Sequence, residues 1–184
     1  MSRQRSDFTY EDYAALPDDG RRWELIDGEL VPITPAPNMR HQNVVGRVFR
    51  AIADHLDRHG GGQVFVAPVD VVLADISTVQ PDVVYLADAS ADLMTPANIQ
   101  GPPTLTVEVV SDRRHDLVRK CHLYARFGVA EYWAVDPEAD QIQVFRLSRA
   151  GEPYPKPLLL VPGEELTTPL LPGLSVAVAG LLAR

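Results

Sequence analysis

A short apolar segment with a glutamate in its middle constrains this chain more than any other stretch. Residues Thr104–Val110 are apolar enough for a central strand, yet Glu108 lies among them. A charge in such a place is costly unless it is paired or binds a metal. The pattern then predicts a helix, roughly Arg114–Phe127, ended by Gly128, and another strand, Glu131–Val135. The fold must therefore bring a partner to Glu108.

The predicted helix offers a basic residue for this role. Asp116 and Lys120 are four residues apart, so they lie on one helical face, and Tyr124 belongs to the apolar stripe beside them. Only two of the 17 basic residues are lysines, Lys120 and Lys156. In a chain that otherwise uses arginine, Lys120 needs an explanation. Asp116 either orients this lysine or forms an ion pair with it worth about 0.2–0.5 kcal/mol.

The N-terminal half predicts a short helix, a hairpin and a long helix. A capped helix over roughly Thr9–Leu16 precedes a hairpin over Arg22–Val31, whose Asp27-Gly28 pair favours a type I′ turn. A proline-rich loop over 32–37 follows. An amphipathic helix then runs from His41 to about His59 and ends at three glycines.

Short strands account for most of the remaining chain. Gln63–Leu73 predicts two strands or one bent strand, because Pro68 cannot serve a central ladder. Before the central stretch, the pattern predicts a turn over Asp75–Gln80, a strand over Pro81–Leu86 and a loop over 87–103 with one helical turn. After it, the pattern predicts a strand over Gln141–Leu147 that pairs with Glu131–Val135, a strand over 158–161, and a strand with a short helix over 174–182. Helices on both sides of a mixed sheet, an α/β fold, are the expected architecture.

Composition limits the classes of protein open to the chain. Its 184 residues suit one domain, and no apolar run approaches the roughly 18 residues of a transmembrane helix, so no membrane partner is expected. Cys121 is the only cysteine, which fits a reducing, cytoplasmic location. A net charge of −8 argues against a protein coated in positive charge for binding nucleic acid, but not against a nuclease with a local site.

Asp82, Glu108 and Lys120 form the candidate site. Asp82 opens a predicted strand and Glu108 lies inside the next, so the two carboxylates converge if the strands are neighbours. Two oxygen ligands plus waters suit Mg²⁺, which can activate a water and neutralise charge on a phosphodiester. The alternative is structural: Asp82 is a turn residue, Glu108 pairs with an arginine, and Lys120 is solvated.

Two further residues have open roles. Glu24 in the hairpin is either an additional acid near the metal or a solvent-facing strand residue. His41 either contacts a metal or phosphate at its helix start or simply begins the helix. The other histidines show no clustering with cysteine, which argues against a zinc site. A two-carboxylate glycosidase is remote, since the loops lack aromatic residues for stacking on sugars.

An ordered set of motifs resembles a known family. The segments are WELIDGELV (23–31), PDVV (81–84), VEVVS (107–111), D-x-x-x-K-x-x-x-Y (116–124), GVAEYWAVDP (128–137) and LPGL (171–174). Together they resemble the Uma-two family of restriction-endonuclease-like proteins, in the PD-(D/E)XK superfamily. The resemblance implies one domain over 1–184, with a core of helix, three strands, helix and strand over about 41–136, an N-terminal helix-hairpin and a C-terminal β extension.

The resemblance also implies an endonuclease that uses Mg²⁺ or Mn²⁺ to cleave DNA. Asp82 and Glu108 match the two acids, and together with the backbone carbonyl of Val109 they would hold the metal. The usual lysine, two residues after the second acid, is replaced by Val110. Lys120 matches the place from which similar members supply it from the next helix, where it would position the attacking water.

Two expectations concern assembly and activity. A homodimer is expected for cleavage of both strands, and the apolar segment Leu170–Leu182 is either its interface or the completion of the core. The rival function is a non-catalytic binding or assembly module that keeps the nuclease fold. The net charge and the lysine missing after Glu108 motivate it.

Overall fold

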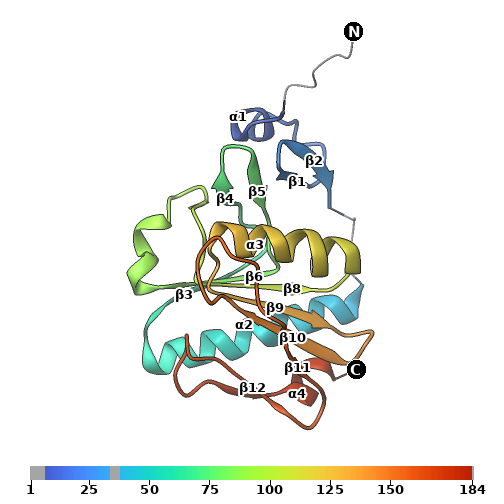
Figure 1. The fold of residues 1–184 in the computed structure, drawn as a ribbon, viewed down its shortest axis with the longest axis vertical. Coiled ribbons are helices and arrows are strands. Elements are labelled where there is room, and N and C mark those ends of the chain that lie inside the picture. Colours follow the sequence, from blue (N-terminus) through green and yellow to red (C-terminus); the bar gives the residue numbers. More distant parts are fainter. Residues whose placement is uncertain (1–6, 34–37, 184) are drawn as a thin grey trace.

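The six-stranded sheet at the centre of the molecule confirms the predicted mixed α/β architecture. A computed structural model describes residues 7–33 and 38–183, so the loop predicted over 32–37 lies partly outside the described residues. The strand order is β11-β10-β9-β8-β6-β3 (Figure 1). The strands are β3 (Gly62–Val66), β6 (Val83–Ala87), β8 (Leu105–Val109), β9 (Glu131–Asp136), β10 (Gln141–Arg146) and β11 (Leu158–Leu160).

Neighbouring strands of this sheet run in both directions. β6 and β8 are antiparallel, with Val83 opposite Val107, whereas β8 and β9 are parallel. β10 pairs antiparallel with β9, as predicted, and β11 continues the sheet. Because β6 and β8 are direct neighbours, the condition for bringing Asp82 and Glu108 together is met.

Helices cover the two faces of the sheet (Figure 1). Side chains alternate along β9: Trp133 and Val135 pack in the cluster that contains α2 (Met39–His59), while Tyr132 and Ala134 pack in the cluster that contains α3 (Cys121–Phe127). Asn38 caps the start of α2 by accepting the His41 N–H, so the helix begins two residues before the predicted start.

The predicted helix over Arg114–Phe127 has two parts. Its first part, His115–Lys120, is a π-helix, and α3 continues it to Phe127. Gly128 ends the helix with a positive φ of 87°, a backbone conformation that glycine adopts readily. The π-helix, with its wider turn, is the part that carries both Asp116 and Lys120.

A second sheet lies beside the first, in the order β2-β1-β5-β4-β7. Its strands are β1 (Trp23–Ile26), β2 (Glu29–Pro32), β4 (Val71–Ala74), β5 (Ser77–Val79) and β7 (Ile99–Gln100). The β1–β2 hairpin is confirmed: Ile26 pairs with Glu29 across Asp27 and Gly28, whose φ values of 52° and 75° suit a type I′ turn. Figure 1 shows this hairpin next to α3.

The turn predicted over Asp75–Gln80 is present but shorter, since it is limited to Asp75 and Ile76 and β5 follows it directly. β5 is buried and pairs with β4, the strand just before it, and with β1, which is distant in the sequence. Gln63–Leu73 divides around Pro68 into β3 and β4, which belong to different sheets. The two-strand interpretation of that segment is therefore confirmed.

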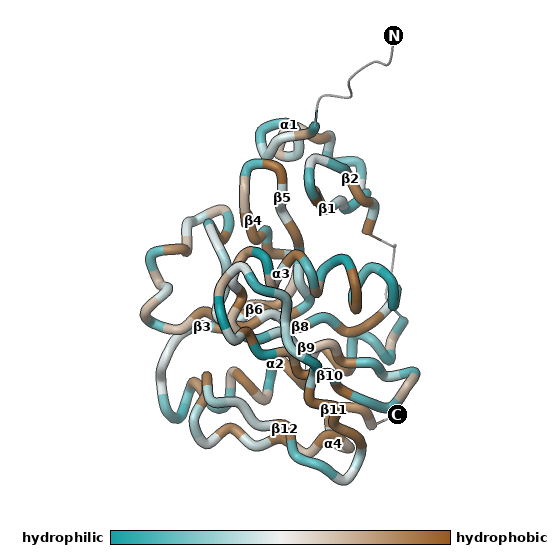
Figure 2. Tube along the Cα trace, viewed as in Figure 1, coloured by the Kyte–Doolittle hydropathy of each residue, from teal (hydrophilic) through white to brown (hydrophobic). Residues whose placement is uncertain are grey.

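The remaining elements complete the fold. They are α1 (Tyr10–Ala14), capped by Thr9, the 3₁₀-helix η1 (Asp88–Leu93), β12 (Glu165–Thr167), β13 (Ser175–Ala177) and α4 (Val178–Leu182). Leu174, Val178 and Leu181 are buried in the same cluster as α2, so the C-terminal segment completes the core. Figure 2 shows hydrophobic residues gathered along the central strands and at α4. Within the described residues, no helix combines the length and the apolar character needed to cross a bilayer.

Candidate active site

Adjacent strands bring Asp82 and Glu108 to one place. Asp82 directly precedes β6, and its Oδ2 accepts the backbone N–H of Val109, the residue after Glu108, at 2.8 Å. His41 Nε2 lies 3.3 Å from the same Asp82 oxygen. The start of α2 therefore also contributes to the site, and His41 does more than begin a helix.

Lys120 is buried and paired with two carboxylates. Its Nζ lies 2.8 Å from Glu108 Oε1 and 2.9 Å from Glu24 Oε1, and its side chain is only 6% exposed. The structural interpretation, with Lys120 solvated and Glu108 paired with an arginine, is wrong. The ammonium group points to Glu108, as expected, but its second partner is Glu24, and no direct contact joins it to Asp82 among the described residues.

Glu24 is buried, so its interpretation as a solvent-facing strand residue is wrong. Besides Lys120, its Oε1 accepts the backbone N–H of Gln80 at 2.9 Å, and its Oε2 lies 2.9 Å from His115 Nε2. Gln80 is two residues before Asp82, so this contact ties the second sheet to the start of β6.

Asp116 neither contacts Lys120 to orient it nor forms an ion pair with it, which were the two roles that its spacing predicted. Its Oδ2 accepts the backbone N–H groups of Ser111 and Asp112 at 2.9 and 3.1 Å, and in the described structure it forms no ion pair with Lys120. The nearby backbone donors hold this carboxylate instead. Asp116 therefore fixes the turn by which the chain leaves β8 for the helix.

Tyr124 and His115 are site residues that the sequence pattern did not reveal. The Tyr124 hydroxyl donates to Glu108 Oε1 at 2.6 Å, although the helical pattern placed Tyr124 in an apolar stripe. The signal available was the spacing itself, since Tyr124 follows Lys120 by four residues and shares its helical face. For His115 the sequence holds no comparable signal, because its partner Glu24 comes from a distant strand.

The buried charges are not balanced within the cluster. Burial raises the pKa of Glu108 well above its usual value; Lys120 opposes this, while Asp82, Asp116 and Glu24 add to it. Burial also opposes ionisation of Glu24, but Lys120 and His115 outweigh it and hold the pKa of Glu24 at about 2. Burial favours the neutral form of Lys120, yet Glu108 and Glu24 raise its pKa above the usual value. One lysine thus serves two buried carboxylates, and Glu108 is the one whose ionised form is disfavoured.

The pattern of contacts fits a divalent metal ion. On Glu108, Oε1 takes the contacts from Lys120 and Tyr124; on Asp82, Oδ2 takes those from Val109 and His41. The second oxygen of each carboxylate accepts no hydrogen bond from the described residues. No group of three or more His, Cys, Asp or Glu side chains in the described ranges is arranged to hold a metal. Mg²⁺ does not need one, because it is commonly held by one or two carboxylates and keeps several waters.

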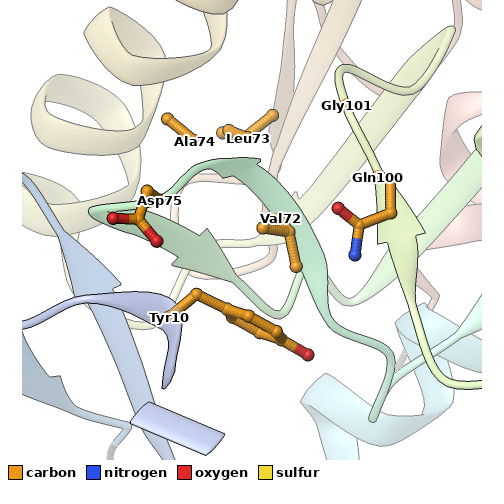
Figure 3. A pocket seen from close by; sticks show the side chains of 7 residues that line it. All are labelled: Tyr10, Val72, Leu73, Ala74, Asp75, Gln100 and Gly101. Atoms are coloured by element: carbon orange, nitrogen blue, oxygen red, sulfur yellow. The ribbon is translucent and has the colours of Figure 1, made fainter. Parts of the chain in front are cut away.

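A separate pocket of about 420 Å³ lies between Tyr10 and the second sheet (Figure 3). Its polar side chains include Tyr10 and Gln100, and both are already hydrogen-bonded to Asn98. None of the residues that contact the carboxylates of the candidate site lines this pocket. The pocket is therefore separate from the candidate site at Asp82, Glu108 and Lys120.

A mixed sheet flanked by helices, with two acids on adjacent strands and a buried lysine beside them, places the chain among proteins with a nuclease-like fold. The model of the Uma2 family, described as a putative restriction endonuclease, matches residues 10–179. The chain therefore belongs to the Uma2 family, as its motifs predicted.

A solved structure supports the fold independently. The chain is similar to a crystal structure described as a putative nuclease belonging to DUF820 from Anabaena variabilis ATCC 29413. The TM-score is 0.79 at 16% sequence identity, and the match covers 96% of this chain and 98% of the other. A search of curated proteins finds no match.

Proposed function

We propose that the protein is a metal-dependent endonuclease that hydrolyses phosphodiester bonds in DNA. The observation that carries this proposal is the asymmetric use of the two carboxylates. Asp82 directly precedes β6 and Glu108 lies in the neighbouring β8, and each has one oxygen that is fixed and one that accepts no donor from the described residues. Fixed carboxylates with free oxygens are suited to binding a cation, and membership of the Uma2 family supports the nuclease assignment.

Each residue of the site has a proposed role. Asp82 and Glu108, with the backbone carbonyl of Val109, hold Mg²⁺ or Mn²⁺. The bound metal would lower the pKa of a water molecule and neutralise charge on the scissile phosphate. Lys120 has three N–H donors, of which Glu108 and Glu24 occupy two. The third donor is left to position the attacking water or to stabilise the negative charge that develops on the phosphate.

The proposal requires DNA to bind through local contacts at the site, because a protein with a net charge of −8 has no general electrostatic attraction to DNA. Cleavage of both strands of a duplex needs two active sites, so a homodimer is part of the proposal. Light scattering at working concentration measures the oligomeric state directly. A monomeric protein would be expected to nick one strand.

Supercoiled plasmid tests the activity, because a single nick converts it to the relaxed form. Purified protein with Mg²⁺ or Mn²⁺ should relax the plasmid, and chelation should stop the reaction. Since the metal contributes several kcal/mol of transition-state stabilisation, Asp82→Ala and Glu108→Ala should each lower the rate at least about 1,000-fold. Asp92→Ala, at an exposed acid on η1, is the matched control. Nicking by both site variants at the wild-type rate would disprove these roles.

The rival function is a binding or assembly module that keeps the fold without catalysis. One observation favours it: burial raises the pKa of Glu108, which disfavours the ionised form that binds a metal. Calorimetric titration with Mn²⁺ separates the two functions. Binding that disappears in Asp82→Ala supports the endonuclease, whereas the absence of binding to the wild type supports the module.

A further inference from the structure

We infer that Glu24 is a positioning residue for Lys120, supplied by the β1–β2 hairpin of the second sheet, and that it is not a metal ligand. The inference rests on the proposed nuclease function for its consequence in catalysis. Its structural part, the holding of Lys120 by Glu24, rests on contacts alone.

The contacts of Glu24 differ from those of the two proposed metal ligands. Glu24 Oε1 receives Lys120 Nζ and the Gln80 backbone N–H, both at 2.9 Å, and Oε2 receives His115 Nε2 at 2.9 Å. Both of its oxygens are therefore occupied by donors of the protein. Among the described residues, Asp82 and Glu108 each leave one oxygen with no donor, whereas three of the roughly four acceptor positions of Glu24 are filled and neither of its oxygens is without a contact.

The π-helix explains how one carboxylate meets two side chains of the same helix. His115 and Lys120 are five residues apart, which matches the i→i+5 repeat of a π-helix, and they contact different oxygens of Glu24. In an α-helix, residues five apart are about 140° apart around the axis, so they would diverge. The unusual local geometry thus turns both side chains toward the hairpin.

Further ion pairs fix the hairpin over the helix. Arg119 lies 2.7 Å from Glu29 and also donates to the backbone carbonyl of Ile26, and Arg126 pairs with Asp27 in the hairpin turn. These contacts are more exposed than the Glu24–Lys120 pair. They add contacts between the hairpin and the helix, and exposed ion pairs of this kind each contribute little.

The consequence concerns the direction of the Lys120 ammonium group. A lysine side chain is a flexible stem with a point charge, and a single carboxylate can be approached from several directions. Glu108 comes from the first sheet and Glu24 from the second, so contact with both leaves the third N–H donor in one direction. Glu24 therefore sets where Lys120 presents its remaining donor.

The composition of the chain makes this testable without any activity assay. Lysine labelled with ¹³C at Cε gives two signals, one from buried Lys120 and one from exposed Lys156, which serves as an internal reference. In wild type, relaxation should show an ordered Lys120 Cε and a mobile Lys156 Cε. Glu24→Gln should make the Lys120 Cε mobile and shift its signal, while Lys156 stays unchanged. Glu29→Gln, an exposed acid of the same hairpin, should leave both signals as in wild type.

The second arm measures metal binding and catalysis on the same variants. Because Glu24 supports a catalytic side chain indirectly, its loss should lower kcat about 10–100-fold, the range seen for such supporting partners. KM for DNA and the calorimetric affinity for Mn²⁺ should not change. If Glu24→Gln does not fold, as judged by dispersion of its amide spectrum, Glu24→Asp tests the same point. Its shorter side chain keeps the charge but withdraws it from Lys120.

The outcomes separate the two proposals. An ordered Lys120 Cε in a folded Glu24 variant overturns the inference, and so does a loss of Mn²⁺ affinity, which would make Glu24 a ligand. If wild type binds metal but cuts no DNA, the proposed function fails, while a mobile Lys120 in Glu24→Gln still supports the positioning role.

Discussion

The two large sheets use buried carboxylates in opposite ways. The six-stranded sheet carries Glu108 and places Asp82 beside it, and each acid keeps one oxygen that receives no donor from residues 7–33 and 38–183. The five-stranded sheet carries Glu24, whose two oxygens are both occupied. Incomplete pairing of a buried charge costs free energy, so it persists where it serves a function. Asp82 and Glu108 thus have the oxygens that a bound cation would need, whereas Glu24 holds the side chain of Lys120 from the other sheet.

Removal of Lys120 should have the largest effect on stability, because it affects both sheets. Lys120→Met leaves Glu24 and Glu108 buried without their shared cation, and breaking a buried pair in this way costs about 3–5 kcal/mol. Urea unfolding at neutral pH measures the change. Lys156→Met, at the exposed lysine, is the control and should be close to wild type. Equal stability of the two variants would mean that Lys120 is not a structural partner of either acid.

Glu24 should make a smaller contribution that depends on pH. Its pKa of about 2 lies below the ordinary value of a glutamate, about 4.3, so folding favours the ionised form. That stabilisation is complete above the ordinary pKa and is lost as the pH falls toward 2. At neutral pH the free energy of unfolding of wild type should exceed that of Glu24→Gln by roughly 1–3 kcal/mol, which is the cost of leaving a buried partner unsatisfied.

The difference in unfolding free energy between wild type and Glu24→Gln should shrink as the pH falls from about 5 to about 2. Urea unfolding of both proteins across this range gives the difference directly. A constant difference would show that Glu24 acts through shape and not through charge.

The exposed contacts between hairpin and helix should contribute least. Arg126 and Asp27 are each about half exposed, and exposed ion pairs contribute about 0–1 kcal/mol. Arg126→Gln should therefore lower the free energy of unfolding by less than Glu24→Gln does, and the effect should fall further at high salt. If Arg126→Gln lost as much unfolding free energy as Glu24→Gln, the contact at the turn would contribute as much as Glu24 to holding the hairpin on the helix.

Periodicity was sufficient to predict the long elements of the fold. The amphipathic pattern predicted α2, and apolar segments with turn residues predicted β8, β9 and the β1–β2 hairpin. β5, β7 and β12 were not predicted. Each is only two or three residues long, and β5 and β7 also pair with strands that are distant in the sequence, β1 and β4 respectively.

The candidate site was predictable only in part, for a related reason. A carboxylate inside an apolar strand, and a rare lysine on the next helix, are visible in the sequence, and the structure pairs them. The burial of Glu24 is not visible, because a glutamate in a four-residue hairpin strand usually faces solvent until another layer covers it. The contacts of Asp116 also depend on a turn whose free N–H groups only the folded backbone shows.

The π-helix makes the length of this part of the chain a functional constraint. Each residue of an α-helix turns the chain by about 100°, so the loss of one residue rotates everything before it relative to everything after it. Val118 is half exposed and lies between His115 and Lys120. Its deletion would let 115–127 form one α-helix. The turn that Asp116 holds would then be rotated about the helix axis relative to Lys120. Homologous sequences that shorten this helix by one residue would have to rebuild the exit from β8 to keep the lysine in place.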